Sequence, residues 1–266
     1  MSRVWVRIVP CFTFVVALGL LTVPRAEAAL MLSATIGGTN YCVTDNNVAC
    51  GFGTNLTDVN PAVGVIDLGA TPLLLSGLSV TGTVSQAVIA TVAGQNNSIN
   101  INSTNITNTT AAPINAVLSV SATNYNGPAT TAFVSGSGTW QDGTTGSVAG
   151  STATMTWYND PTNTQGADTA LDRPGTLLAT FGDTATSPVD SYSTTQGPIP
   201  VNDPGLFSMT LGFDLVIQPF AQLVSRGQNE LKPLAATAVP EPATLTLLGL
   251  GLGGLRFLRR QRRQVA

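Results

Sequence analysis

Histidine is absent from all 266 residues of the chain. Without it, neither a Ser-His-Asp nor a Cys-His nucleophilic site can form, and a catalytic zinc centre of the usual kind loses its commonest ligand. The sequence also holds no G-x-S-x-G nucleophile elbow and no glycine-rich phosphate loop. Hydrolysis by these routes is therefore excluded, and we expect no cofactor and no metal.

Basic residues are scarce in the stretch 29–238. Arg173, Arg226 and Lys232 stand there against twelve acidic residues, which gives a net charge of −9. Such a surface repels phosphate backbones, and it has no Lys/Arg cluster with which to release counterions. Nucleic acid is therefore excluded as a partner.

The first 28 residues have the layout of a cleaved secretory signal. Arg3 and Arg7 form a positive leader, residues 8–23 are almost entirely apolar, and Ala26-Glu27-Ala28 is a small-x-small cleavage site. We predict cleavage between Ala28 and Ala29 and a protein that is exported through the inner membrane. The alternative is an uncleaved anchor helix, against which Pro24 and the cleavage site argue.

Cysteine is also scarce, with three in the whole chain. Cys11 leaves with the predicted signal peptide, so the mature chain keeps Cys42 and Cys50. An even pair in an exported protein is most simply a disulfide, the alternative being two free thiols. The loop it would close is short, and chain entropy predicts a stabilisation of only about 2.5 kcal/mol.

No helix of ordinary length is expected between residues 29 and 225. Short apolar segments with a period of two alternate with turns rich in Gly, Pro and Asn, which predicts an all-β body, an antiparallel β-sandwich or jelly roll. The predicted strands cover 30–36, 62–68, 73–84, 87–92, 96–110, 114–122, two segments around Trp140 and Trp157, 176–181 and 206–220. Segment 96–110 is so polar that it predicts an edge strand or a polar ladder.

The remaining segments are predicted to be loops: 39–60, 160–174, 183–204 and a linker over 226–238. The first of these is rich in oxygen ligands, so a calcium site is an alternative to a solvated loop. The segment from 132 to 157 is predicted to form a long hairpin, with its turn at Asp142-Gly143. Parity places Trp140 and Trp157 in the core, and it places Tyr158 on a polar face near Asn159 and Asp160.

The C-terminal tail, residues 239–266, begins with Val239-Pro240-Glu241-Pro242. Residues 243–255 carry no charge and span roughly 20 Å as a helix, against a bilayer core of about 30 Å. Five arginines follow and would stay on the cytoplasmic side: Arg256, Arg259, Arg260, Arg262 and Arg263. The tail therefore predicts a short transmembrane helix that holds the body outside.

This order of motif, apolar span and arginines resembles the PEP-CTERM sorting signal of exopolysaccharide-producing Gram-negative bacteria. The resemblance implies that exosortase, a membrane enzyme, recognises Pro240-Glu241-Pro242 and cuts the tail, so that membrane attachment is transient. The alternative is an ordinary tail anchor with a proline-rich hinge. We expect the mature protein at the cell surface or outside the cell.

Three functions are compatible with this sequence. The favoured one is a non-catalytic structural protein of the cell surface or of the extracellular polysaccharide matrix. The alternative is a carbohydrate-binding module for exopolysaccharide, in which Tyr158 contacts the sugar. A glycoside hydrolase is less favoured, and it would need a carboxylate pair such as Asp168 with Asp172 or Asp142 with Asp160.

Overall fold

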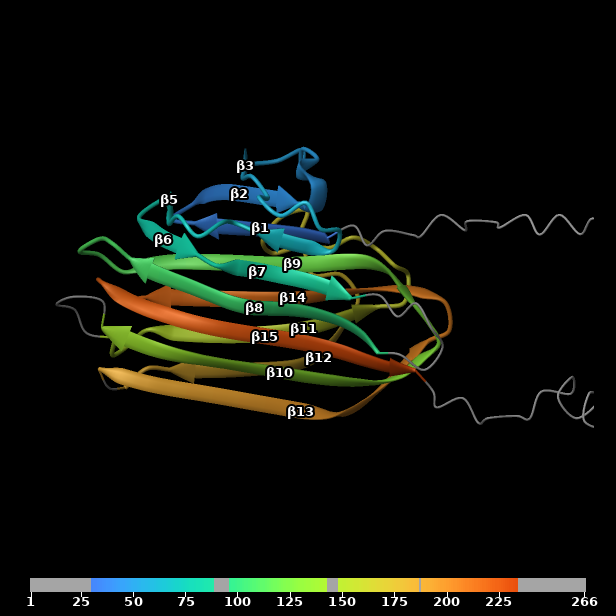
Figure 1. Cartoon of the computed structure of the whole chain (residues 1–266). Coiled ribbons are helices and arrows are strands. Elements are labelled where there is room, and N and C mark those ends of the chain that lie inside the picture. Colours follow the sequence, from blue (N-terminus) through green and yellow to red (C-terminus); the bar gives the residue numbers. More distant parts are fainter. Residues whose placement is uncertain (1–29, 89–95, 143–147, 187, 234–266) are drawn as a thin grey trace, which may run out of the picture.

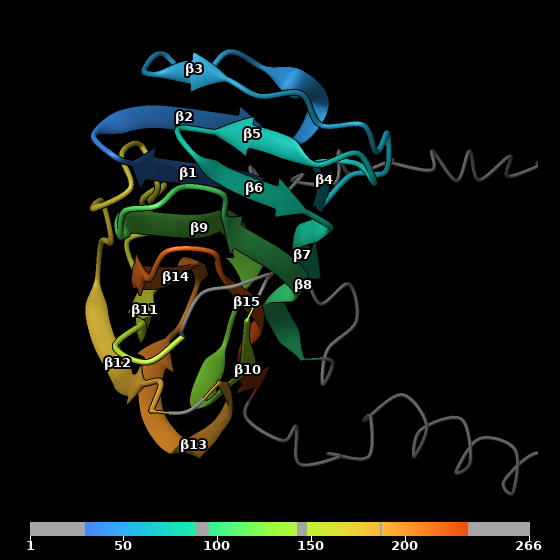
Figure 2. The ribbon, with the colours of Figure 1, turned by 90° about the vertical axis from the view of Figure 1, so that its left-hand side faces the viewer.

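The structure is a computed structural model that describes residues 30–88, 96–142, 148–186 and 188–233. These residues form two sheets packed face to face as a β-sandwich (Figures 1 and 2), so the predicted all-β body is confirmed. The predicted signal peptide, the tail and its helix lie outside the described residues. Within those residues, no helix has the length and apolar character needed to cross a membrane.

Sheet A has seven strands and is antiparallel except at its β2–β3 edge. Its spatial order is β12 (Thr176–Thr184), β11 (Thr152–Asp160), β14 (Leu206–Ile217), β9 (Ile114–Asn126), β1 (Leu30–Ile36), β2 (Thr39–Thr44) and β3 (Thr54–Asn55). The short 3-10 helix η1 (Asp45–Asn47) follows β2. The first three strands of the sequence, β1 to β3, therefore lie together at one edge of sheet A.

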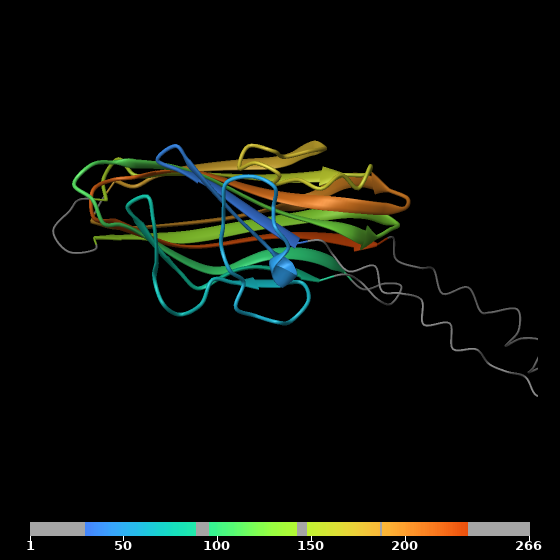
Figure 3. The ribbon, with the colours of Figure 1, turned by 90° about the horizontal axis from the view of Figure 1, so that it is seen from above.

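Sheet B has eight strands. Its main path is β13 (Val189–Asp203), β10 (Ala129–Asp142), β15 (Ala221–Pro233), β8 (Asn97–Asn108), β6 (Leu78–Thr81) and β5 (Leu73–Leu75); β7 (Thr83–Val88) also pairs with β8, and β4 (Val65–Asp67) pairs with β7. Viewed from above, the long strands of the two sheets lie in two layers (Figure 3). Between the layers lies a continuous apolar core.

The core contains the residues that alternation placed there. Trp140 of β10 and Trp157 of β11 are both completely buried, as predicted. Trp140 Nε1 donates to Asp183 Oδ2 at 3.1 Å, which satisfies one indole group in the core. The outer edges of β12 and β13 meet beside it, where Phe181 and Tyr192 have ring centroids 5.8 Å apart. The sandwich is thus closed along this side.

The predicted hairpin from 132 to 157 is wrong, because β10 belongs to sheet B and β11 to sheet A. From β8 onward, most connections cross from one sheet to the other, so consecutive strands face each other across the core instead of pairing. A turn signal marks where the chain reverses, but it does not say which strand becomes the hydrogen-bonded neighbour.

Three segments that were predicted to be loops or a linker form strands. Residues 39–44 form β2, 189–203 form β13 and 226–233 complete β15. β13 and β15 are rich in polar residues because one face of each is exposed to solvent, whereas β2 is exposed only at Thr39 and Asn40, where it begins. β13 tolerates Pro198 and Pro200 because it is an edge strand, where a missing N–H need not break a ladder.

Segment 96–110 is not an edge strand, since β8 pairs with β15 on one side and with β6 and β7 on the other. Ile99, Ile101 and Ile106 fill the core from its inner face. Asn108 is also buried and donates to the carbonyl oxygens of Ala112, Ile217 and Gln218. The asparagines on its other face occupy the outer surface of sheet B.

Candidate functional site

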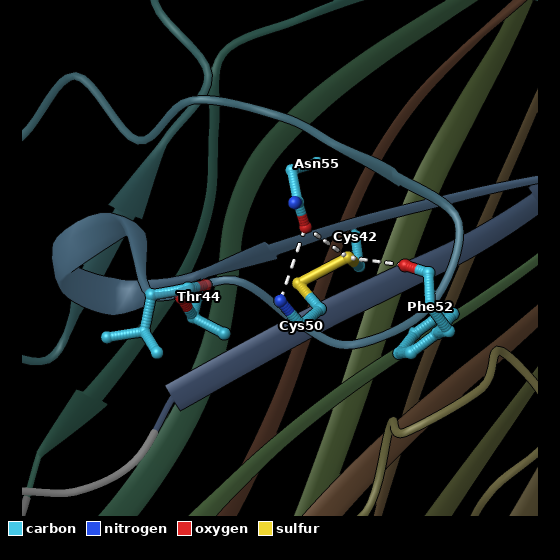
Figure 4. Close-up of a disulfide and its surroundings, with 6 residues drawn as sticks. Cys42, Thr44, Cys50, Phe52 and Asn55 are labelled. Atoms are coloured by element: carbon cyan, nitrogen blue, oxygen red, sulfur yellow. Dashed lines mark hydrogen bonds between the residues drawn. A yellow bond between two sulfur atoms is a disulfide. The ribbon is translucent and has the colours of Figure 1, made fainter.

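The disulfide between Cys42 and Cys50 is present, as predicted (Figure 4). Cys42 is buried on β2, and its sulfur lies 3.1 Å from Phe52 O and 3.2 Å from Asn55 Oδ1. A disulfide sulfur has no hydrogen to donate, so these are close contacts. Asn55 Oδ1 accepts instead from the Cys50 N–H at 3.2 Å. The disulfide therefore fastens the loop after β2 to the edge of sheet A.

The oxygen-rich segment 39–60 uses its carboxylates to hold backbone. Asp58 Oδ1 accepts from the N–H groups of Asn60 and Asp67 at 2.9 and 3.0 Å, and Asp45 Oδ2 accepts from Gly64 N–H at 2.6 Å. No group of three or more His, Cys, Asp or Glu side chains suited to a metal occurs among the described residues. The calcium alternative therefore gains no support in this part of the chain.

The first carboxylate pair, Asp168 and Asp172, lies within the loop 161–175. Asp172 Oδ2 accepts from the Asp168 N–H at 3.3 Å. Partial burial, and next to it the charge of Asp172, raises the pKa of Asp168 above its ordinary value. The two aspartates are therefore neighbours, but one of them is engaged in organising the backbone of its own loop.

The second pair, Asp142 and Asp160, is ruled out by distance. Asp160 pairs with Ser208 near the start of β14, whereas Asp142 pairs with Ala221 just beyond the end of β14. A strand rises about 3.3 Å per residue, so the two carboxylates are separated by about 30 Å. Glycosidase carboxylates lie within about 10 Å of each other.

Tyr158 is half-buried on the outer face of sheet A, beside Thr210 of β14. The two residues that follow it do not extend this face as a polar site. Asn159 is buried and donates to both carboxylate oxygens of Asp203 at 2.9 Å, and Asp160 accepts from Thr162 and Thr164. Tyr158 thus keeps its predicted face, but Asn159 and Asp160 are committed to structure.

The acids around Asn159 have opposite pKa shifts. Burial raises the pKa of Asp203, and the Asn159 hydrogen bonds only partly counter it. Burial also acts to raise the pKa of Asp160, but hydrogen bonds from Thr162 and Thr164 outweigh it, so this pKa lies below its ordinary value. Both shifts follow from roles within the fold, and neither group opens into a described pocket.

A hollow of about 340 Å³ lies on sheet B, across β13, β10, β15 and β8. Small hydroxyl and amide side chains dominate its lining, together with one cation; the polar members are Asn100, Asn102, Ser135, Ser137, Ser193, Thr194, Thr195, Arg226 and Gln228. Sequence reasoning missed this site because each strand contributes only two or three of these residues.

Two glycines explain why the sheet dips at this point. Gly136 of β10 and Gly227 of β15 lie opposite each other and are both part of the lining. A Cβ at Gly136 would lie 2.5 Å from Met155 Cε, and one at Gly227 would lie 2.9 Å from Phe213 Cζ. The backbone of sheet B therefore lies closer to sheet A here than residues with side chains would allow.

Residues 238–263 match the model of the PEP-CTERM protein-sorting motif. The predicted resemblance is thus confirmed: the chain is a β-sandwich protein with a PEP-CTERM tail. The motif marks a protein that exosortase sorts to the outside of the cell. No curated protein matches the sequence.

Three solved structures illustrate the similarity of the sandwich to other proteins. TmCBM61 in complex with β-1,4-galactotriose is 13% identical over 59% of this chain and 89% of its own, with a TM-score of 0.29. The C-terminal CBM6 of LamC from Zobellia galactanivorans is 10% identical over 56% and 89%, with a TM-score of 0.22. The C-terminal family 22 module of Clostridium thermocellum Xyn10B is 14% identical over 62% and 90%, with a TM-score of 0.24. With TM-scores this low, these similarities do not indicate what this chain binds.

Proposed function

We propose that this chain is a non-catalytic structural protein of the cell surface or of the extracellular polysaccharide matrix, which exosortase processes. The sorting motif at residues 238–263 carries the proposal, because it addresses the body to the outside. The described body suits that location. It is cross-linked by the Cys42–Cys50 disulfide and built on two sheets that close along β12 and β13.

Export and processing are tested at both ends of the chain. The protein recovered outside the cell should begin at Ala29 and lack the arginines at 256–263. Glu241→Ala should trap an uncut form in the membrane fraction. The two prolines that flank Glu241 favour an extended backbone, which presents this side chain to the sorting enzyme. Thr244→Ala, three residues further on, is the matched control and should be processed normally.

Mass spectrometry of the exported and membrane fractions reads out both ends. Deleting the exosortase of the producing cells should reproduce the Glu241→Ala result in the wild-type chain. An exported protein that loses its tail equally well with and without exosortase would refute the sorting part. A protein found free in the medium, with none in the isolated matrix, would refute the matrix part.

Carbohydrate binding is a second candidate function, and the hollow on sheet B favours it. Hydroxyl and amide groups both donate and accept, so they match sugar hydroxyls. Tyr158 on sheet A offers a different contact, in which its ring would stack on a sugar. Tyr158→Ala should weaken retention on the polysaccharide of the producing cells if sheet A is the binding face. Unchanged retention, with the fold intact by circular dichroism, would rule out that face.

A further inference from the structure

The charges on the outer face of sheet B differ from those of the rest of the body. Two of the three basic residues between 29 and 238 lie on the outward side of β15, Arg226 and Lys232, with Glu230 between them. Arg173, the third, forms an ion pair with Asp214 on sheet A. The stretch 29–238, which carries a net charge of −9, thus has a face whose strand β15 bears a net positive charge.

Arg226 is the cation within the hollow. It is exposed, and it forms no ion pair or side-chain hydrogen bond with another described residue. Lys232 differs, because its Nζ lies 4.3 Å above the ring of Phe133 and outside the lining of the hollow. Glu230 accepts a hydrogen bond from Asn96. Of the three charged side chains on β15, Arg226 is therefore the one that has no partner within the described part of the chain.

The polar side chains around Arg226 form two rows across the strands. One row is Ser193, Ser137 and Arg226, and the other is Thr195, Ser135, Gln228 and Asn100, each member facing the next in register. Strands lie about 4.8 Å apart, so the longer row spans about 14 Å. That length suits several units of an extended polymer, and the lining contains no aromatic residue on which a sugar ring would stack.

We propose that this hollow binds an acidic polysaccharide, with Arg226 pairing a carboxylate of the polymer and the two polar rows binding its hydroxyls. The inference rests on the proposed matrix function and adds to it the site and the class of ligand. A guanidinium binds a carboxylate through two parallel hydrogen bonds, a geometry that neither lysine nor a neutral amide provides. Binding should therefore depend on both charge and shape.

The test uses the exported protein, purified from the producing cells, in affinity electrophoresis through gels that contain sodium alginate, a polyuronate, or neutral dextran. Alginate should retard the protein, dextran should not, and added salt should weaken the retardation. Arg226→Ala should weaken alginate binding by roughly tenfold or more, since it removes a charge-assisted pair. The affinity of Arg226→Lys for alginate should lie between that of the wild type and that of Arg226→Ala.

Two further variants separate this site from general charge effects. Lys232→Ala removes the same charge from the same face of the same strand, but outside the hollow, and should weaken binding less than roughly threefold. Ser135→Phe leaves the charge unchanged and fills the hollow, so it should weaken binding as much as Arg226→Ala. Thermal unfolding of each variant checks that the fold is retained.

Several results would overturn the inference. Equal losses in Arg226→Ala and Lys232→Ala would show non-specific attraction, and full binding by Ser135→Phe would show that the hollow is not used. Equal retardation by dextran and by alginate would show that binding does not depend on the carboxylates of the polymer. If the wild-type protein is held in the native matrix and yet passes freely through alginate, the acidic-polymer site is wrong while the matrix function stands.

Discussion

Arg173 holds the loop 161–175 onto sheet A, and this predicts a coupling that can be measured. Its guanidinium lies on the outer face, where Nη2 is 2.6 Å from Asp214 Oδ1 and Nη1 donates to Thr156 Oγ1 at 3.1 Å. Gly212 of β14 lies directly beneath, and a Cβ there would overlap the guanidinium carbon. Gly212→Ala should therefore push Arg173 away from its partners.

The expected loss of stability follows from the hydrogen bonds and the ion pair that Arg173 would lose. Its side chain is 8% exposed and that of Asp214 is 43% exposed, so the pair is screened on one side only. Hydrogen bonds to charged groups contribute about 1.5–3 kcal/mol each when buried, and partly exposed pairs contribute less. We expect Arg173→Ala, and separately Gly212→Ala, to lower the free energy of unfolding by about 2–4 kcal/mol.

The double variant gives the decisive comparison. Once Arg173 is alanine, the close neighbour left for an added Cβ is Thr156 Oγ1 at 2.5 Å, a hydroxyl that can rotate away, so Gly212→Ala should cost clearly less than it does in the wild type. Urea unfolding of the wild type, the two single variants and the double variant completes the cycle. Additive losses in the double variant would refute the claim that Gly212 is small in order to seat Arg173.

Two other predictions concern stability. Reducing the Cys42–Cys50 disulfide should lower the free energy of unfolding by about 2.5 kcal/mol, the value that chain entropy gives for so short a loop. Urea unfolding with and without reductant measures this loss, and no difference would show that the crosslink does not constrain the unfolded chain. Asn159→Ala should cost about 1.5–3 kcal/mol at neutral pH, where buried Asp203 is charged and loses its amide donor. Because burial raises the pKa of Asp203, its carboxyl gains a proton as pH falls, so the loss should shrink towards acidic pH and grow as pH rises; a pH-independent loss would contradict the assignment.

The sequence alone determined what depends on local order. The alternation around Trp140 and Trp157 has a period of two, which by itself assigns a face, and both side chains are in the core. The disulfide followed from there being two cysteines close together in an exported chain. The tail could be recognised because its motif, apolar span and arginines are contiguous, and residues 238–263 match the sorting motif.

Only the tertiary structure decided how the strands pair and where their outer faces meet. The polar strands β8, β13 and β15 resemble an edge or loops in sequence, because half of their residues face solvent and propensity does not reveal which neighbours supply the missing backbone hydrogen bonds. The hollow needs four strands, of which β8 and β15 are more than a hundred residues apart in the chain. Ser137, Ser193 and Arg226 are unremarkable along the sequence, and they become a site because strand pairing places them side by side over a pair of glycines.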